Sequence, residues 1–402
     1  MTALQTLRDA LRPRGRLLTV FNVVTGLIMA VGAVLLYQRF RYGLGAITNL
    51  TQDVPWGLWI GFDVVTGVAF AGGAYVLTFM VYVLRMESYR PIVRVTVLNG
   101  FLAYVFYAGA LLLDLGRPWN VVNPIIGNGF GVSSVLFLVA WHFLLYMMAT
   151  LLEFSPAIVE WLGLERTRKV LGGLTLGAVI FGVTLSTLHQ SGLGALYMMA
   201  KPKIHPLWYS DFIPVLFFVS SIFAGLSMVI FEGSITHKVF QHRVGKDLHA
   251  SESRILVGLS RVCAGAMFVY LFLVSLALVH EGSWRHAGEP MFAWWLIEVV
   301  GFVLVPMGLF LRGGLHRSMR LIRIAAAAAL VGVLLNRLNL TVIGFRWDAA
   351  VRYVPTWQEI VVTLAVISAE LWVFRWVVNR LPVLAPLHEE TPSRGAVPTP
   401  AE

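Results

Sequence analysis

The chain has a single cysteine, Cys263, in 402 residues. An iron–sulfur cluster is held by about four thiolates and a disulfide needs two, so this chain holds neither. Charge is also scarce, because Asp, Glu, Lys and Arg make up 13% of the residues while 58% are hydrophobic. An average soluble protein carries about 25% charged residues. The composition therefore predicts a polytopic membrane protein.

The chain also lacks a pair of histidines on any one long hydrophobic run. Two bis-histidyl haems in a helical bundle need four histidines in such pairs, so we predict no haem. His142 lies alone in the middle of the fourth run. For this residue a haem ligand, a proton relay and a hydrogen-bonded core residue remain open alternatives.

Ten hydrophobic runs are long enough to cross a hydrocarbon core of about 30 Å as helices. These runs are 17–38, 56–84, 92–113, 131–152, 170–189, 212–236, 255–279, 291–311, 320–338 and 357–378. We predict an all-α fold of ten transmembrane helices, with two four-helix bundles and two peripheral helices. The expected divisions are a basic N-terminus at 1–16, a membrane domain at 17–380 with bundles at about 56–189 and 212–338, and a disordered tail at 381–402.

Lysine and arginine are distributed unequally between the two sets of loops. The loops that follow odd-numbered runs carry nine of these residues, whereas the other loops and both termini carry 21. Basic loops stay in the cytoplasm, so both termini are predicted to be cytoplasmic, in a bacterial inner membrane. The net charge of +10 then reflects topology and contact with lipid headgroups, and it does not indicate nucleic acid.

Polar residues gather where the fifth run is expected to leave the bilayer on its outer side. His189, Gln190 and Ser191 follow Leu188, and a second polar and aromatic cluster occupies 205–211. Groups that carry protons at a membrane boundary suit an amphiphile with a polar head and an apolar tail. A quinone is such a ligand. We interpret His189 as the hydrogen-bond and proton donor to a quinone head.

Further polar residues lie near the same side. Asp63 is about two turns into the second run, either as a cap for a neighbouring helix or as a functional carboxylate. Asp114 and Arg117 are three residues apart and are expected to pair, in a structural or a catalytic role, before Pro118 ends the helix. Trp56 is expected at the membrane interface.

Charged residues also occur in the predicted inner half of the membrane. Glu232 and Arg261 lie at similar depth, and we expect them to pair, because each alone in lipid is costly. With His142 they form a candidate proton path from the cytoplasm. Glu298 and Glu370 are each either a relay or a packing partner.

Five motifs resemble those of one family, the NrfD/PsrC-type quinone-interacting membrane subunits. They are Pro55–Asp63 (PWGLWIGFD), Asp114–Arg117 (DLGR), Leu188–Ser191 (LHQS), His205–Trp208 (HPLW) and Phe231–Ser234 (FEGS). The likeness covers about residues 40 to 385, and the nearest branch is the ten-helix subunit of periplasmic uptake nickel–iron hydrogenases. The chain departs from that branch at Leu138, where the branch has an acid, with His142 one turn further on.

The resemblance implies a quinone, menaquinone or ubiquinone, as ligand, with no haem and no metal. It implies partners outside the cytoplasm: a ferredoxin-like iron–sulfur subunit and a catalytic subunit such as a nickel–iron hydrogenase. It also implies that Tyr104 is a functional tyrosine and Glu232 an inner acid. The expected sites are catalytic His189, Asp63 and Asp114; quinone-binding Trp56, Tyr104, Arg117 and His189; and a proton path of Glu232, Arg261 and His142.

These observations predict a membrane subunit of a respiratory oxidoreductase complex that exchanges electrons between quinone and an iron–sulfur partner. The electrons come from the partner, because the chain has no redox centre of its own. Proton translocation remains open. The alternatives are a passive membrane anchor for a redox complex and a secondary transporter, for which helices broken at mid-membrane are typical.

Overall fold

The computed structural model describes residue 12 and residues 18–127, 131–240 and 246–384. Within these residues the chain is helical, and its only β-pairing is an isolated bridge between Ile204 and Phe345. Ten helices are long and apolar enough to cross a membrane, which confirms the predicted all-α fold. The predicted basic N-terminus and disordered tail lie outside the described residues, apart from residue 12 and residues 381–384.

Several spans are built from two or more consecutive helical segments. The elements of the first half are α2 (Val20–Tyr42), η2 (Trp59–Thr66), α3 (Gly67–Phe70), α4 (Gly73–Thr78), η3 (Phe79–Val83), α5 (Arg90–Asp114), α6 (Asn123–Ile126), α7 (Val135–Trp161) and α8 (Glu165–Met198). Those of the second half are α9 (Ile213–Val239), α10 (Lys246–His280), α11 (Pro290–Leu296), η9 (Ile297–Leu304), α12 (Val305–Leu315), α13 (Met319–Leu338), η10 (Asn339–Ile343) and α14 (Trp357–Val378). The segments η2, η3, η9 and η10 are π-helical.

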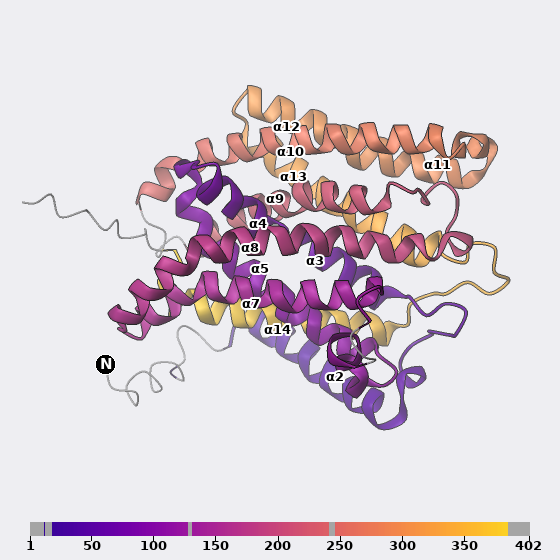
Figure 1. The fold of residues 1–402 in the computed structure, drawn as a ribbon, viewed down its shortest axis with the longest axis horizontal. Coiled ribbons are helices and arrows are strands. Elements are labelled where there is room, and N and C mark those ends of the chain that lie inside the picture. Colours follow the sequence, from indigo (N-terminus) through magenta and orange to yellow (C-terminus); the bar gives the residue numbers. More distant parts are fainter. Residues whose placement is uncertain (1–11, 13–17, 128–130, 241–245, 385–402) are drawn as a thin grey trace, which may run out of the picture.

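The long helices run side by side along one direction (Figure 1). The second span packs against α5 and α8, and α7 packs against these same two helices to complete the first group. Helices α9, α10, α12 and α13 form a second group. The two groups meet where α9 packs against α3, α4 and α8. Helices α2 and α14 pack against each other and reach the first group through α5. This arrangement is two four-helix bundles with two peripheral helices.

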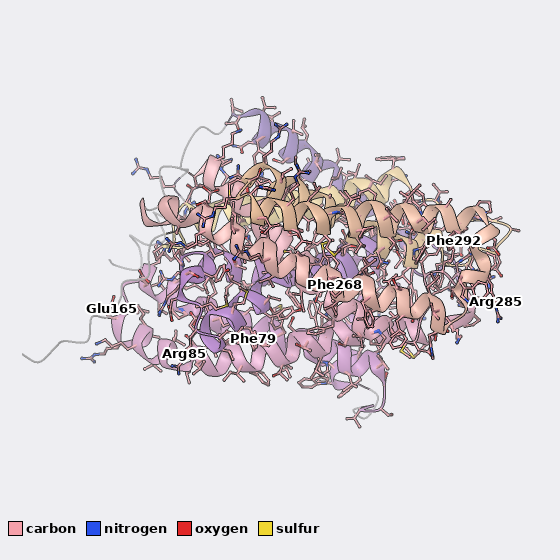
Figure 2. The ribbon with its side chains drawn as sticks, turned by 90° about the horizontal axis from the view of Figure 1, so that it is seen from above. Phe79, Arg85, Glu165, Phe268, Arg285 and Phe292 are labelled. Carbon is pink, nitrogen blue, oxygen red and sulfur yellow. The ribbon has the colours of Figure 1, made fainter. Side chains whose placement is uncertain are left out.

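The outward side chains of the bundle are apolar along most of its length. Phe268 lies about half-way along α10 and is 63% exposed (Figure 2). Arg85 and Glu165 lie at one end of the bundle, and Arg285 at the other (Figure 2). We name the end with Arg285 the outer end and the end with Arg85 and Glu165 the inner end, following the predicted orientation.

The second span is interrupted at Ala71 and Gly72, between α3 and α4. A Cβ atom on Gly225 of α9 would lie 1.9 Å from the backbone nitrogen of Gly73. One on Gly72 would lie 2.6 Å from the Ser221 carbonyl oxygen. Small residues let helix backbones approach closely in membranes. These glycines therefore serve the crossing of the second span with α9, which gives the break a structural cause other than a transport site.

One sequence-based boundary is wrong. The fifth run was expected to leave the bilayer at His189, but α8 continues without a break to Met198. The segment after His189 stays helical because its small residues pack against neighbours: a Cβ atom on Gly194 would lie 2.7 Å from Pro214. His189 is therefore in the interior of a helix and not in a loop.

Candidate functional site

His189 lies inside the first bundle and is 1% exposed. Its Nδ1 atom is 3.2 Å from the carbonyl oxygen of Val139 on α7. A carbonyl can only accept a hydrogen bond, so Nδ1 carries a proton in this arrangement. The neutral imidazole then presents an unprotonated Nε2, which makes no hydrogen bond within the described residues. The Nδ1 atom of His189 thus fixes the orientation of the ring, and its Nε2 atom is available to accept a hydrogen bond.

Several buried polar atoms around His189 also lack a hydrogen bond within the described part of the chain. We name this group the His189 cluster: the Tyr104 and Tyr146 hydroxyls, Ser186 Oγ, His189 Nε2 and Gln190 Oε1. The amide nitrogen of Gln190 donates to the carbonyl oxygen of Val68 at 2.9 Å, which orients its oxygen. Buried polar atoms are nearly always paired with protein or water. Ser186 also lies within interaction range of the Tyr104 and Tyr146 hydroxyls. His189 Nε2, which has no such neighbour among the described residues, indicates a site for water or for the polar part of a ligand.

Aromatic rings surround the cluster. Tyr104 and Phe143 pack against the imidazole of His189, with ring centroids 5.7 and 5.5 Å away. Tyr146 packs against Tyr104 at 4.6 Å. Phe143 and its neighbour His142 are only half-buried, so this side of α7 is partly exposed next to the His189 cluster. Two pockets occur elsewhere in the described residues, one beside Glu232 and one beside Glu298, and neither is lined by the His189 cluster.

The predicted carboxylates form a second group near the outer end, which does not include His189. Asp63, on the π-helical η2, is 1% exposed and accepts a hydrogen bond from Thr363 of α14 at 3.0 Å. Asp114 ends α5 and lies within electrostatic reach of Asp63. The structure therefore places Asp63 within electrostatic reach of Asp114, and no contact of either with His189 is found among the described residues.

The expected pairing of Asp114 with Arg117 is wrong, because Arg117 is exposed and the described residues contain no ion pair between the two. Arg39 of α2 takes this place. It is 2% exposed and donates to the carbonyl oxygens of Leu113 and Leu115, on either side of Asp114. Two side chains three residues apart lie on the same face of a helix, which favoured this pair. Helix α5 ends at Asp114, however, so Arg117 is no longer on that face.

Trp56 packs in the outer half between the two bundles, with Tyr197 and Phe345 each at a centroid distance of 5.1 Å. It is half-buried and does not contact the His189 cluster through any described ring pair. Its place fits an interfacial tryptophan.

The expected pair of Glu232 and Arg261 is also wrong. Glu232 accepts a hydrogen bond from the side-chain amide of Asn99 on α5 and lies within electrostatic reach of Glu370. Arg261 is exposed on α10, near Tyr89. Similar depth in the membrane was the only basis for this pair, and depth does not determine the direction in which a side chain points. His142, the third residue of the predicted proton path, lies near His189. It is distant in sequence from both Glu232 and Arg261.

The second bundle holds a polar network that the sequence did not reveal. Glu298, on the π-helical η9, is 3% exposed and accepts three hydrogen bonds. The donors are Trp208 Nε1 at 2.7 Å, Asn336 Nδ2 at 2.7 Å and Asn339 Nδ2 at 2.5 Å. Arg337 is 1% exposed and donates to Asn336 Oδ1 and Ser220 Oγ. With these partners Glu298 is a packing partner and not an isolated relay.

Other residues of the candidate sites were also missed. Tyr146 lies four residues after His142 and Ser186 three before His189, and this helical spacing was the signal that could have revealed them. Arg39 gave no such signal, because its partner is on a distant span.

The outer loop around His205 is a structural junction. His205 is fully buried, and its Nδ1 accepts from the Leu207 N–H at 3.2 Å. Its Nε2 lies 3.5 Å from a Glu289 carboxylate oxygen, and Trp347 packs on the ring at 4.7 Å. Burial lowers the pKa of His205 from its ordinary value of 6.5, and the nearby Glu289 offsets this only in part.

We expect the folded chain to lose stability as the pH falls below about 6.5, because the unfolded state then binds a proton that buried His205 resists. A His205→Asn variant keeps an acceptor for the Leu207 N–H and should show a smaller loss. Thermal unfolding of the purified protein between about pH 8 and pH 5.5 measures this. His316→Asn, at an exposed histidine, is the control. Equal pH dependence of the His205 variant and the unmodified chain would contradict the prediction.

Comparison with known proteins identifies the family. Residues 46–346 match the family described as polysulphide reductase, NrfD. The chain belongs to the NrfD family. This membership confirms the resemblance found in the sequence motifs.

Three relatives align with most of this NrfD protein. A protein of Nitratidesulfovibrio vulgaris is 40% identical over 370 residues, which are 92% of this chain and 95% of the relative. The probable Ni/Fe-hydrogenase 2 b-type cytochrome subunit of Escherichia coli is 29% identical over 383 residues, 94% and 96% of the two chains. The menaquinone reductase integral membrane subunit of N. vulgaris is 26% identical over 359 residues, 80% and 81%.

The name of the E. coli relative raises the question of haem in this NrfD protein. An axial histidine needs the open face of a macrocycle beside its free nitrogen. The imidazole of His189 packs against the rings of Tyr104 and Phe143. The described contacts do not decide whether a haem binds, and the absence of haem stays a prediction.

Proposed function

We propose that this NrfD protein is the membrane subunit of a respiratory oxidoreductase complex and that a quinone head binds at the His189 cluster. The observation that carries the proposal is the group of buried, unpaired polar atoms between Tyr104 and His189. The relatives named a menaquinone reductase subunit and a hydrogenase subunit support a quinone as substrate and an oxidoreductase as partner. The passive-anchor alternative offers no reason for these unpaired atoms.

Reduction of a quinone to a quinol consumes two electrons and two protons. In our proposal the electrons come from an iron–sulfur subunit docked at the outer end, because the single thiol of Cys263 cannot hold a cluster. A catalytic subunit, for example a nickel–iron hydrogenase, reduces that partner. The quinone enters from the lipid beside Phe143 and His142, whose half-buried rings move aside.

The proposed roles follow from the hydrogen bonds. His189 donates Nδ1–H to Val139, so its neutral form accepts at Nε2 and suits taking a proton from a quinol hydroxyl. Once protonated, the same nitrogen donates to a quinone oxygen, so His189 serves either direction of electron flow. The Tyr104 hydroxyl donates to the substrate oxygen. Asp63 and Asp114 act at a distance from the quinone and not as its direct partners.

Replacing Tyr104 with phenylalanine is expected to weaken binding of a short-chain menaquinone analogue by about 5- to 10-fold, because one hydrogen bond worth about 1 kcal/mol is lost. The measurement is a titration of the purified complex with the analogue. Tyr75→Phe is the matched control, since the Tyr75 hydroxyl is buried but bonds to Ser221 at 2.9 Å. Unchanged affinity in the Tyr104 variant would contradict a head at this cluster.

A further inference from the structure

Helices α5 and α14 pack against each other and carry polar side chains on their facing sides. Residues seven, eight or eleven apart lie on one side of a helix. Tyr107 and Asp114 of α5 lie within electrostatic reach of Glu370 and Glu359 of α14, respectively. Thr363 of α14 donates a hydrogen bond to Asp63, and Asn99 of α5 donates one to Glu232 of α9. Together these side chains form a line of polar groups, which we name the α5–α14 seam.

The outer part of the seam holds three carboxyl groups, two of which accept hydrogen bonds from described side chains. Glu359 is fully buried and accepts from the Tyr353 hydroxyl at 2.5 Å. It lies within electrostatic reach of Asp114, which in turn faces Asp63. Asp63 accepts from Thr363, and its other carboxylate oxygen has no hydrogen bond within the described residues. This oxygen is therefore available to hold a proton or to accept a hydrogen bond.

Tyr107 joins the outer and inner parts. Its ring packs against Gly67, one turn beyond Asp63, where a Cβ atom would lie only 2.4 Å from the ring. The Tyr107 hydroxyl lies within electrostatic reach of Asp63, Glu370 and Glu232. A tyrosine hydroxyl both donates and accepts, so it can pass a proton between carboxyl groups.

The inner end of the seam opens into a pocket. Glu232, hydrogen-bonded to Asn99, lines this pocket together with Thr96, Thr236 and Glu252. Thr96 and Asn99 are less than one turn apart on α5, so the pocket continues the seam toward the inner end of the bundle. Polar groups along a pocket wall are suited to binding water.

We propose that protons for quinone reduction, a reaction that rests on the function proposed above, pass from this inner pocket along the α5–α14 seam. Several carboxyl groups close together away from water are costly unless some hold a proton, so such a line keeps exchangeable protons. Tyr104 lies three residues before Tyr107 on α5 and belongs to the His189 cluster, so in this proposal it passes the proton from the seam to the quinone. For each quinone, two electrons arrive from the iron–sulfur partner and two protons from the carboxyl and hydroxyl groups of the seam. These groups are then protonated again from the inner pocket.

The test uses the purified complex in vesicles, with a pH-sensitive dye on the inner-end side and separate measurement of quinol formed. Glu370→Gln and Glu232→Gln are each expected to lower the rate of proton uptake from that side about tenfold or more. Binding of the quinone analogue should change less than about twofold, because both residues lie outside the His189 cluster. Glu370→Asp, which keeps a carboxyl group, should retain more uptake than Glu370→Gln.

Glu153→Gln is the matched control. Glu153 is also a half-buried carboxyl group in the inner half, but it lies on α7 against Gly182 of α8 and away from the seam. Its substitution should leave uptake unchanged. The proposed proton path would be overturned by normal inner-side uptake in the Glu370→Gln complex. It would also be overturned if the Glu153 variant lost uptake while both seam variants kept it. Absence of quinol formation in the unmodified complex would instead overturn the proposed function.

Discussion

Replacing His189 with alanine is expected to lower quinone-linked turnover of the purified complex about 100-fold or more. A positioned proton donor or acceptor contributes about 10²- to 10⁴-fold to the rate of such a step. His189 is the only imidazole of the His189 cluster, and its Nε2 is free to meet the substrate oxygen. The measurement is the rate of quinone-analogue reduction, with the electron donor of the partner subunit in excess.

Two further variants make the His189 result specific. His189→Gln fills most of the same volume, so it separates loss of chemistry from loss of packing, and it should be nearly as inactive as the alanine variant. His316→Ala, at an exposed histidine of the inner end, should retain the unmodified rate. Turnover near the unmodified rate in both His189 variants would favour the passive-anchor alternative.

Replacing Glu298 with alanine is expected to destabilise the protein by about 3 kcal/mol or more, because each buried donor left without an acceptor costs about 1–3 kcal/mol. The change leaves three donors, from Trp208, Asn336 and Asn339, without an acceptor. It also removes a carboxyl group near Arg337, which is buried and has its guanidinium 3.5 Å from the Phe217 ring centre. Thermal unfolding in detergent, followed by the folded fraction on size-exclusion chromatography, measures the loss.

Glu87→Ala is the control for Glu298. Glu87 pairs with Arg90 at 2.9 Å, but both side chains are about half exposed or more, at 61% and 48%. An exposed pair of this kind contributes about 0–1 kcal/mol, so little change is expected. A Glu298 variant as stable as the Glu87 variant would show that the network is not a structural element of the second bundle.

Sequence-based reasoning was most accurate where the lipid environment leaves few alternatives. A backbone in hydrocarbon must satisfy its own hydrogen bonds, so about 20 apolar residues in a row become a helix. The number of spans and the family followed from this rule and from short motifs. The position of His189 did not, because polar residues continue a helix as readily as they end it when they face a neighbouring span.

Pairings of charged side chains were least accurate. Asp114 was assigned to Arg117 and Glu232 to Arg261, yet their neighbours are Arg39, and Asn99 with Glu370. Spacing along one helix and depth in the membrane are local quantities. The true partners come from spans far apart in the chain, and the rotation of each helix determines which side chains meet.

By itself, the sequence determined that this chain is a ten-helix membrane protein with one thiol. It also made His189 a candidate site residue, and the family resemblance added Tyr104 and Glu232 as predictions. Only the tertiary structure decided which polar groups are buried together: the unpaired atoms around His189, the satisfied network of Glu298 and the seam between α5 and α14. The physical reason is that hydrophobicity is a sum over residues, which a sequence contains. Hydrogen bonding depends on distance and direction between helices, which only packing defines.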